Sequence, residues 1–308
     1  MILLLTSDDA LSQQRIFATI SGGDLYSIDV ANCNRHFVGA TGIGFGDIAF
    51  TSDGTLWGIS NGDLYKIDTI NASTTLIGNT GVGAVSLVGV NDSIILAEFQ
   101  TNLYGINTNN ASTYLIGHIG YQAIGDLVLI KNDLYMVTPF IKIELNSTFT
   151  EILNVLPINL TLPSCEGAAI FEGDYGSIIG FNGSNLIEIC QYDGSYQVIC
   201  PNLNIDGTPG AASISNYSDN NELVNVFTPN GDGINDIFQP LGKLDQINNI
   251  VVINRWGNAV AELTYPFSWN GTSKTGTELV EGVYYYILKK NDVCNKQIQK
   301  QSMIHLIR

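Results

Sequence analysis

Three acidic residues, Asp47, Asp126 and Glu166, each begin a short apolar segment in the first two thirds of the chain. If these segments line one central channel, the three carboxylates converge at its mouth. Converging carboxylates bind a cation or a polyhydroxyl ligand, and their pKa values are raised. We therefore predict a ligand site here. The alternative is that each side chain caps a turn in water, and Ser86 at the corresponding place interrupts the ring of acids.

The same carboxylates suggest a second interpretation, a hydrolase or lyase that acts on extracellular polysaccharide. Such an enzyme needs an acid and a base about 5–10 Å apart in a pocket. No other catalytic signature supports it, because the sequence has no nucleophile elbow, no zinc-protease helix and no phosphate-cradling loop. We interpret the three histidines, His36, His118 and His305, as surface or packing residues.

A glycine-rich segment near residue 230 suggests a calcium site, because hard oxygen ligands on such a turn suit this ion. The oxygen donors would come from Asn230, Asp232, Asn235 and Asp236. The EF-hand pattern does not fit, since it lacks a carboxylate at both anchoring positions. The alternative is a structural turn in which Asn and Asp side chains cap their own backbone. We expect no other cofactor.

The five cysteines have no C-x-x-C spacing and no nearby histidine, which excludes zinc and thioredoxin-type sites. In an exported protein we expect one or two disulfides and an odd thiol. Cys165, Cys190 and Cys200 are the nearest in sequence. The alternative is that the cysteines are unpaired and pack as small apolar residues.

A repeat of 39 residues positions the acidic segments. The segment from Leu25 to Asp29 recurs from Leu64 to Asp68 and from Leu103 to Asn107, with glycines in the same register downstream. Each unit contains four short β-branched or aromatic segments separated by turn residues, which predicts a four-stranded antiparallel meander. The tyrosines of the repeat, Tyr26, Tyr65 and Tyr104, are expected in the core of each unit rather than on a ligand platform.

Two degenerate units follow, and the first unit lacks its innermost strand. The segment from Gly210 to Ser215 resembles that missing strand and would close a ring of five units. Residues 15–216 resemble the NHL and YVTN β-propellers. The resemblance implies an all-β fold with a five-bladed β-propeller, and it implies little about function because propellers serve many roles.

Charge divides the chain into two modules. The 308 residues carry 13 Lys and Arg against 29 Asp and Glu, a net charge of −16. Up to residue 220 there are 5 basic and 21 acidic residues, whereas residues 221–308 have 8 of each. This balance excludes a general binder of nucleic acid or anionic membrane, and no apolar run could span a bilayer. We expect a linker at 217–221, and we interpret residues 1–14 as the remnant of a secretory signal peptide.

The last module carries the most specific motifs, which begin with a Pro-Asn-Gly-Asp-Gly-Ile-Asn-Asp run and end in an aromatic strand. Residues 222–308 resemble the gliding-motility-associated C-terminal domain, the type B sorting domain of the type IX secretion system. A small antiparallel Ig-like β-sandwich is expected. The resemblance rests on Phe227, Pro229, Asn230, Gly231, Asp232, Gly233, Asn235, Asp236, Arg255, Trp256, Gly257, Trp269, Gly271, Gly282 and Tyr284.

The resemblance implies export through the periplasm to the outer cell surface or the medium, with the type IX secretion machinery as a partner. We therefore expect an exported, monomeric, non-catalytic binding protein whose propeller recognises an extracellular glycan or protein, with no nucleic acid partner and no transmembrane segment. The alternatives are the polysaccharide hydrolase or lyase described above and a structural component of the cell surface.

Overall fold

The computed structural model describes residues 15–20, 22–30, 32–130, 132–162, 165–171, 177–205, 210–213, 226–239, 247–291, 294 and 297–308. The expected signal-peptide remnant at 1–14 and the expected linker at 217–221 lie outside these residues. The chain forms two compact units, Met1–Ser218 and Asp219–Arg308. The described residues contain strands and turns but no helix, and hence nothing with the length and apolar character of a helical bilayer span.

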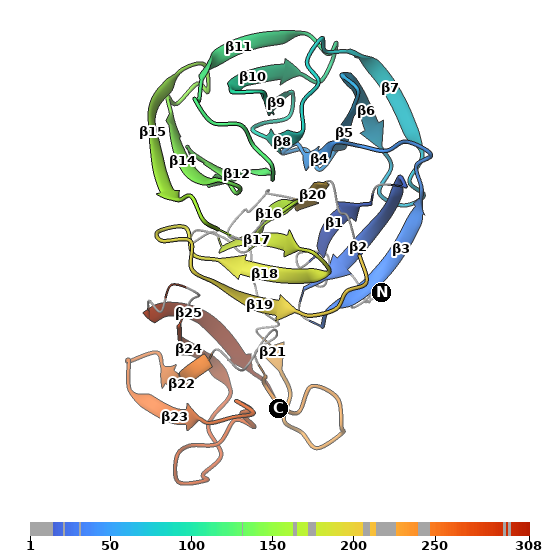
Figure 1. Cartoon of the computed structure of the whole chain (residues 1–308). Coiled ribbons are helices and arrows are strands. Elements are labelled where there is room, and N and C mark those ends of the chain that lie inside the picture. The colour runs from blue at the N-terminus through green and yellow to red at the C-terminus, as the bar shows by residue number, and fades with distance from the viewer. Residues whose placement is uncertain are drawn as a thin grey trace. The chain divides into compact units, whose positions relative to one another are not determined.

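The first unit consists of five four-stranded antiparallel sheets, or blades, arranged around a common axis (Figure 1). Blade 1 is assembled from both ends of the unit, and the other four are continuous in sequence. From the innermost to the outermost strand, the blades are β20 (Gly210–Ser213), β1 (Arg15–Thr19), β2 (Asp24–Asp29), β3 (Asn34–Ala40); β4 (Asp47–Phe50), β5 (Leu56–Ser60), β6 (Asp63–Ile67), β7 (Thr74–Asn79); β8 (Ser86–Gly89), β9 (Ile94–Phe99), β10 (Asn102–Asn107), β11 (Thr113–His118); β12 (Leu127–Ile130), β13 (Asp133–Met136), β14 (Phe140–Leu145), β15 (Ile152–Asn159); and β16 (Ala168–Phe171), β17 (Ser177–Asn182), β18 (Asn185–Ile189), β19 (Tyr196–Cys200).

The ring closes through blade 1. Strand β20 pairs antiparallel with β1, with Phe17 opposite Ala212. The innermost strands contact one another in the cyclic order β4, β8, β12, β16, β20 and back to β4. The predicted five-bladed propeller is therefore confirmed, including the contribution of the last strand to the first blade. Circular closure leaves only short edges at the periphery, which protects the sheets from pairing with other chains.

The hydrophobic cores lie between neighbouring blades. Ala49 and Trp57 of blade 2 pack in one cluster with Leu87 and Ile95 of blade 3, for example. The repeated tyrosines are half-buried at the margins of these clusters: Tyr65 contacts Phe45 edge-on at 5.8 Å. They contribute to the packing of the blades.

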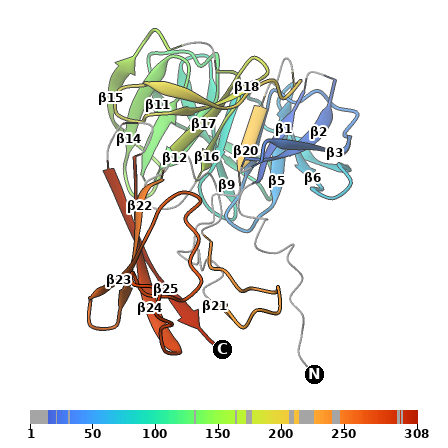
Figure 2. The ribbon, with the colours of Figure 1, turned by 90° about the horizontal axis from the view of Figure 1, so that it is seen from below.

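The second unit contains one five-stranded sheet in the order β21–β25–β24–β22–β23. The long strands β24 and β25 lie side by side along their length (Figure 2). The expected C-terminal β-sheet domain is confirmed. Within it β21 pairs parallel to β25, and two isolated bridges, Phe238 with Trp269 and Thr272 with Glu278, supplement the sheet among the described residues. The strands are β21 (Val226–Phe227), β22 (Ile247–Asn254), β23 (Ala259–Leu263), β24 (Gly282–Asn291) and β25 (Gln297–Leu306).

Candidate functional site

Two of the three predicted acids, Asp47 and Asp126, come together at the start of the innermost strands. Their side chains are 0% and 1% exposed. Glu166 differs, because it is exposed and precedes the corresponding place by one residue. That place is held by Gly167, whose carbonyl accepts a hydrogen bond from Phe181 N at 2.8 Å. The predicted convergence of three carboxylates is therefore reduced to two, and Glu166 is not a member of the cluster.

Hydrogen bonds explain why the side chain of Asp47 is buried. Its Oδ2 accepts from Leu87 N of blade 3 at 2.5 Å, and its Oδ1 accepts from Ile48 N at 2.8 Å. An innermost strand has a free edge toward the channel, so its inward N–H groups need acceptors outside the sheet. Asp47 supplies acceptors for its own strand and for the next blade.

Asp126 has the equivalent role in blade 4. Its Oδ1 accepts from Leu127 N at 2.6 Å and its Oδ2 from Ala168 N of blade 5 at 2.8 Å. Between the two acids, Ser86 Oγ donates to Gly125 O of blade 4 at 2.8 Å. Each polar side chain at the start of an innermost strand thus ties its blade to the following one.

The two carboxyl groups are close enough to affect each other's ionisation. Burial, followed by the charge of Asp126, raises the pKa of Asp47 well above its usual value. Burial raises the pKa of Asp126 to about 7, against the opposing effect of hydrogen bonds from Asp47 and from backbone N–H groups. Two close carboxyl groups in such an environment share one proton.

Glycines at the two remaining positions make room for this pair. A Cβ on Gly210 would overlap Asp47 Oδ1 and lie 2.7 Å from Asp47 Cα. A Cβ on Gly167 would lie 2.9 Å from Ala211 N. The five starts of the innermost strands therefore hold two carboxyls, one hydroxyl and two glycines.

Below this polar layer the channel is narrow and apolar. Its cavity has a volume of about 30 Å³, lined by aliphatic and aromatic residues of all five innermost strands, including Ile48, Leu87, Leu127, Ala168 and Ala211. That volume holds about one or two water molecules. A sugar ring or a peptide does not fit inside, so a ligand would have to bind to the exposed surface around the mouth.

Exposed residues lie shortly before three of the innermost strands: Val85 directly before β8, Ile124 three residues before β12 and Glu166 two residues before β16. Val85 of blade 3 is 44% exposed and Ile124 of blade 4 is 73% exposed. Glu166 of blade 5, the blade that follows these two, is also exposed. We call these three residues the rim. It combines aliphatic surface with one acid, and a ligand role for Glu166 stays a prediction.

Sequence reasoning missed a third buried acid, Glu98 of β9. It lies opposite Ser86 in blade 3, and neither carboxylate oxygen reaches a hydrogen-bond partner among the described residues. Burial raises the pKa of Glu98 to about 7. The repeat contained the signal, because Glu98 corresponds to Ile59 one unit earlier, where the side chain is apolar and buried.

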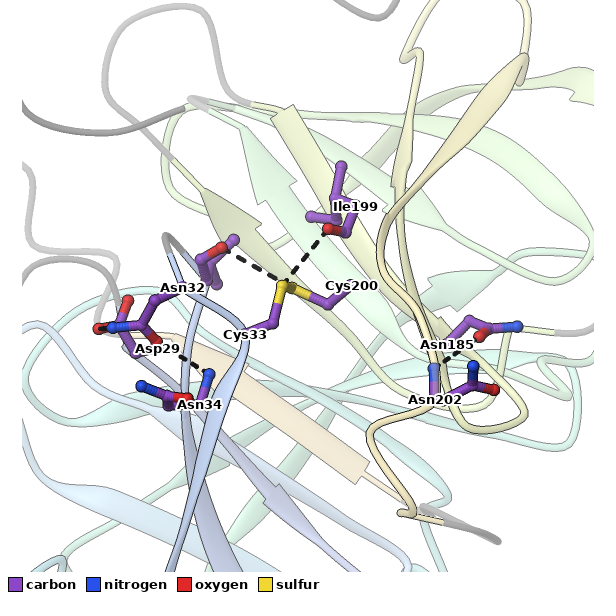
Figure 3. Close-up of a disulfide and its surroundings, with 9 residues drawn as sticks. Asp29, Asn32, Cys33, Asn34, Asn185, Ile199, Cys200 and Asn202 are labelled. Carbon is purple, nitrogen blue, oxygen red and sulfur yellow. Dashed lines mark hydrogen bonds between the residues drawn. A yellow bond between two sulfur atoms is a disulfide. The ribbon is translucent and has the colours of Figure 1, made fainter. Parts of the chain in front are cut away.

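A disulfide joins Cys33 of blade 1 to Cys200 of blade 5, with a Cα–Cα distance of 5.5 Å (Figure 3). Cys33 lies in a turn held by hydrogen bonds from Asn32 Nδ2 to Asp29 and from Asn34 N to Asn32 Oδ1. Cys165, one of the three cysteines nearest in sequence, is a buried free thiol. The disulfide therefore spans 167 residues and bridges the first and last blades.

In the second unit, three of the four side chains proposed for calcium, those of Asn230, Asp232 and Asp236, bind the backbone of their own loop. Asp236 accepts hydrogen bonds from Gly231 N and Gly233 N, both at 2.7 Å. Asp232 Oδ1 accepts from Ile234 N at 2.7 Å, and Asn230 Oδ1 accepts from Asp232 N at 3.1 Å. In the described portion of the chain, no three acidic, histidine or cysteine side chains are grouped to hold a metal. This geometry agrees with the structural alternative, in which Asn and Asp cap the turn.

Several solved structures resemble the chain. A nidogen/laminin complex matches 68% of this chain and 84% of its own at 10% identity and a TM-score of 0.48. An auxiliary nutrient binding protein from Bacteroides ovatus matches 61% and 57% at 10% identity and a TM-score of 0.44. A symmetrical protein from a study of de novo evolutionary emergence matches 64% and 92% at 18% identity and a TM-score of 0.40. No curated protein matches.

The second unit is identified by a family model. Residues 221–306 match the CHU_C type IX secretion signal domain. The predicted resemblance of this module is thereby confirmed, with boundaries that differ by one or two residues. A domain of this kind directs its chain through the type IX secretion system to the cell surface or the extracellular space. The C-terminal unit of this protein is a type IX secretion signal domain that follows a five-bladed β-propeller.

Proposed function

We propose that the protein is an exported, non-catalytic binding protein, and that its propeller recognises an extracellular ligand through the rim formed by Val85, Ile124 and Glu166. The observation that carries this proposal is the contrast between the rim, which is exposed, and the carboxyl pair beneath it, which is buried. The secretion domain supplies the location, and the propeller supplies the rigid scaffold that holds the rim.

The buried pair does not fit the role of a catalytic acid and base. Asp47 and Asp126 use their oxygens for backbone N–H groups of four blades. A general acid or base must come within hydrogen-bond reach of its substrate. The cavity below the pair has room for water only, and this argues against the hydrolase or lyase alternative.

The chemistry of the rim favours a protein over a glycan. Val85 and Ile124 offer aliphatic surface, and exposed aliphatic groups beside a charged group are typical of contacts between proteins. Sugar recognition uses dense polar groups or an aromatic platform, and the repeated tyrosines instead contribute to the packing between blades. We therefore propose a protein ligand with an apolar patch.

Site-specific photo-crosslinking on intact cells tests this proposal. A photoreactive residue at position 124 is expected to give one discrete adduct on the cell surface, competed by an excess of the purified full-length chain. The matched control places the same group at Leu76 on β7, which is also exposed. Adducts that are equal at both positions, or binding of the purified chain to a glycan array, would contradict a protein ligand at the rim. Release of reducing sugar ends by the wild type but not by Asp126→Asn would restore the enzyme alternative.

A further inference from the structure

The secretion domain displays one tryptophan that its own fold does not use. Trp256 is 71% exposed, whereas the other aromatic residues that carry the resemblance to this domain are buried. Phe227, Trp269 and Tyr284 belong to the hydrophobic core of the unit. Tryptophan is the largest apolar side chain and is highly buried on average, so Trp256 departs from the usual placement of this residue type.

Several of the other motif residues have structural uses within the unit. Trp269 Nε1 donates to Thr272 O at 2.8 Å, and Tyr284 Oη donates to Val280 O at 2.8 Å. Asp236 caps its loop as described above. Gly271 has a φ of 79°, and a Cβ there would lie 2.5 Å from Leu306 Cδ1. Folding therefore accounts for these residues and leaves Trp256 unexplained.

The turn that carries Trp256 is rigidly built. It joins β22 to β23, and Asn254 Oδ1 accepts hydrogen bonds from Trp256 N at 3.1 Å and from Asn258 N at 3.0 Å. Asn254 O accepts from Gly257 N at 2.9 Å, and Gly257 has a φ of 83°, which favours glycine. A side chain presented on such a turn loses little conformational entropy when a partner binds it.

The neighbour of Trp256 adds a positive charge to the same surface. The guanidinium of Arg255 lies over the indole at 4.5 Å from its centroid, a cation–π contact. Arg255 is exposed, and it forms no ion pair within the described residues of the unit. Tryptophan and arginine are the residues most enriched among those that dominate the affinity of protein interfaces.

We infer that Trp256, stacked with Arg255, is the contact by which the type IX secretion machinery binds this domain, and that it inserts into an apolar pocket with an acidic rim. This inference deepens the export role of the domain and is independent of the ligand of the propeller. A protein is the expected occupant because the domain is a secretion signal and the turn presents an apolar ring together with an exposed cation.

The test is export of the full chain from the organism that makes it. Trp256→Ala is expected to accumulate in the periplasm, with the amount outside the cell reduced about tenfold or more, as for loss of a dominant interface residue. Its melting temperature should equal that of the wild type, because the ring makes no core contact. Tyr265→Ala is the matched control, since Tyr265 is 74% exposed in the same unit, and it should be exported normally.

Substitutions of Arg255 distinguish an electrostatic contribution to partner binding from packing of the tryptophan ring alone. Arg255→Lys keeps the charge and should retain most of the export, whereas Arg255→Glu should reduce it as strongly as Trp256→Ala. If Trp256→Ala is folded and exported at the wild-type level, or if Tyr265→Ala fails equally, the inference is wrong. Trp256→Gln replaces the alanine variant if the latter unfolds. A chain without residues 219–308 that is still exported would show instead that the domain itself is not the signal.

Discussion

Cys33 and Cys200 form a covalent bond between blades 1 and 5. At the contacts between other neighbouring blades, which we call joints, the corresponding residues are in van der Waals contact without a covalent bond. Cys33 has a φ of 60°, and the residues at the same place of the next two units, Ala72 and Ala111, have φ values of 60° and 58°. All three lie in the turn before the outermost strand of their blade. The backbone is thus the same at each joint, and only the side chain differs.

The position of Cys200 is also equivalent to positions in other blades. Cys200 pairs with Leu186 within blade 5, as Gly39 pairs with Leu25 and Gly78 with Leu64. A Cβ on Gly78 would lie 3.4 Å from the Cβ of Ala111. The disulfide therefore reinforces the joint at which the chain closes on itself, and the internal joints rely on the continuity of the chain.

This equivalence predicts that a further disulfide can be engineered between two blades. The double variant Gly78→Cys/Ala111→Cys should form a bond spontaneously on oxidation, because the Cβ separation is near the range of about 3.5–4.5 Å found in disulfides. Closing that loop should stabilise the propeller by about 2–4 kcal/mol. Mass spectrometry of the cross-linked peptides and the melting temperature measure both effects, with each single variant as a control. Free thiols in the folded, oxidised double variant would show that the joints are not equivalent.

The carboxyl pair predicts a stability that falls as pH rises. In the unfolded chain Asp126 loses its proton near pH 4, whereas in the folded chain its pKa is about 7. Between these values the folded state binds more protons, so the free energy of unfolding decreases as pH rises through this window. Asp47 acts in the same direction.

Asp126→Asn tests this effect. The variant should lose about 1–3 kcal/mol near pH 4.5, because the amide nitrogen cannot accept a backbone N–H, and it should show a smaller decrease between about pH 4.5 and 7.5 than the wild type. Urea titrations at the two pH values measure both quantities. An unchanged pH dependence would mean that the pair carries no shared proton.

Glu98 predicts a substitution that stabilises the protein only at high pH. At about pH 5 the carboxyl is neutral, so Glu98→Gln should leave the melting temperature nearly unchanged. At about pH 8.5 the wild type must keep an unpaired carboxylate in a buried site, which is unfavourable, and the variant should melt higher. Glu151→Gln, an exposed site, is the matched control and should have no effect at either pH. A Glu98→Gln variant that is less stable than the wild type at the higher pH would reveal a partner for the carboxylate.

The 39-residue repeat made the blades predictable from the sequence. Its degenerate copies explain why Glu166 was placed with Asp47 and Asp126 and why the partner of Cys33 was not found. In blades 2 and 4 a Gly-Asp pair begins the innermost strand, at Asp47 and Asp126, but blade 5 has Glu166 followed by Gly167. Gly167 holds the place of Asp47 and Asp126, so an alignment on the acid shifts the register by one residue, and such a shift moves a side chain to the other face of a strand. The partner of Cys33 was equally hidden, because the units between Cys33 and Cys200 vary in length. An acid at the start of an innermost strand is buried when it can accept a hydrogen bond from a backbone N–H of the following blade. The sequence of one blade does not reveal whether the next blade offers such an N–H group.

The closing strand provides the last prediction. Gly210 begins β20, and a Cβ there would overlap the carboxyl of Asp47. Gly210→Ala must therefore displace either the carboxyl pair or β20, and we expect a loss of about 1–3 kcal/mol, as for overpacking of a close-packed core. Gly22→Ala is the matched control, since nothing lies within 4 Å of a Cβ at that glycine. Thermal melting compares the two variants, and reduction of the disulfide should enlarge the difference because β20 then closes the ring without a covalent bond. If both variants melt like the wild type, the carboxyl pair does not occupy the axis beside Gly210, and something other than these side chains must fill the ring.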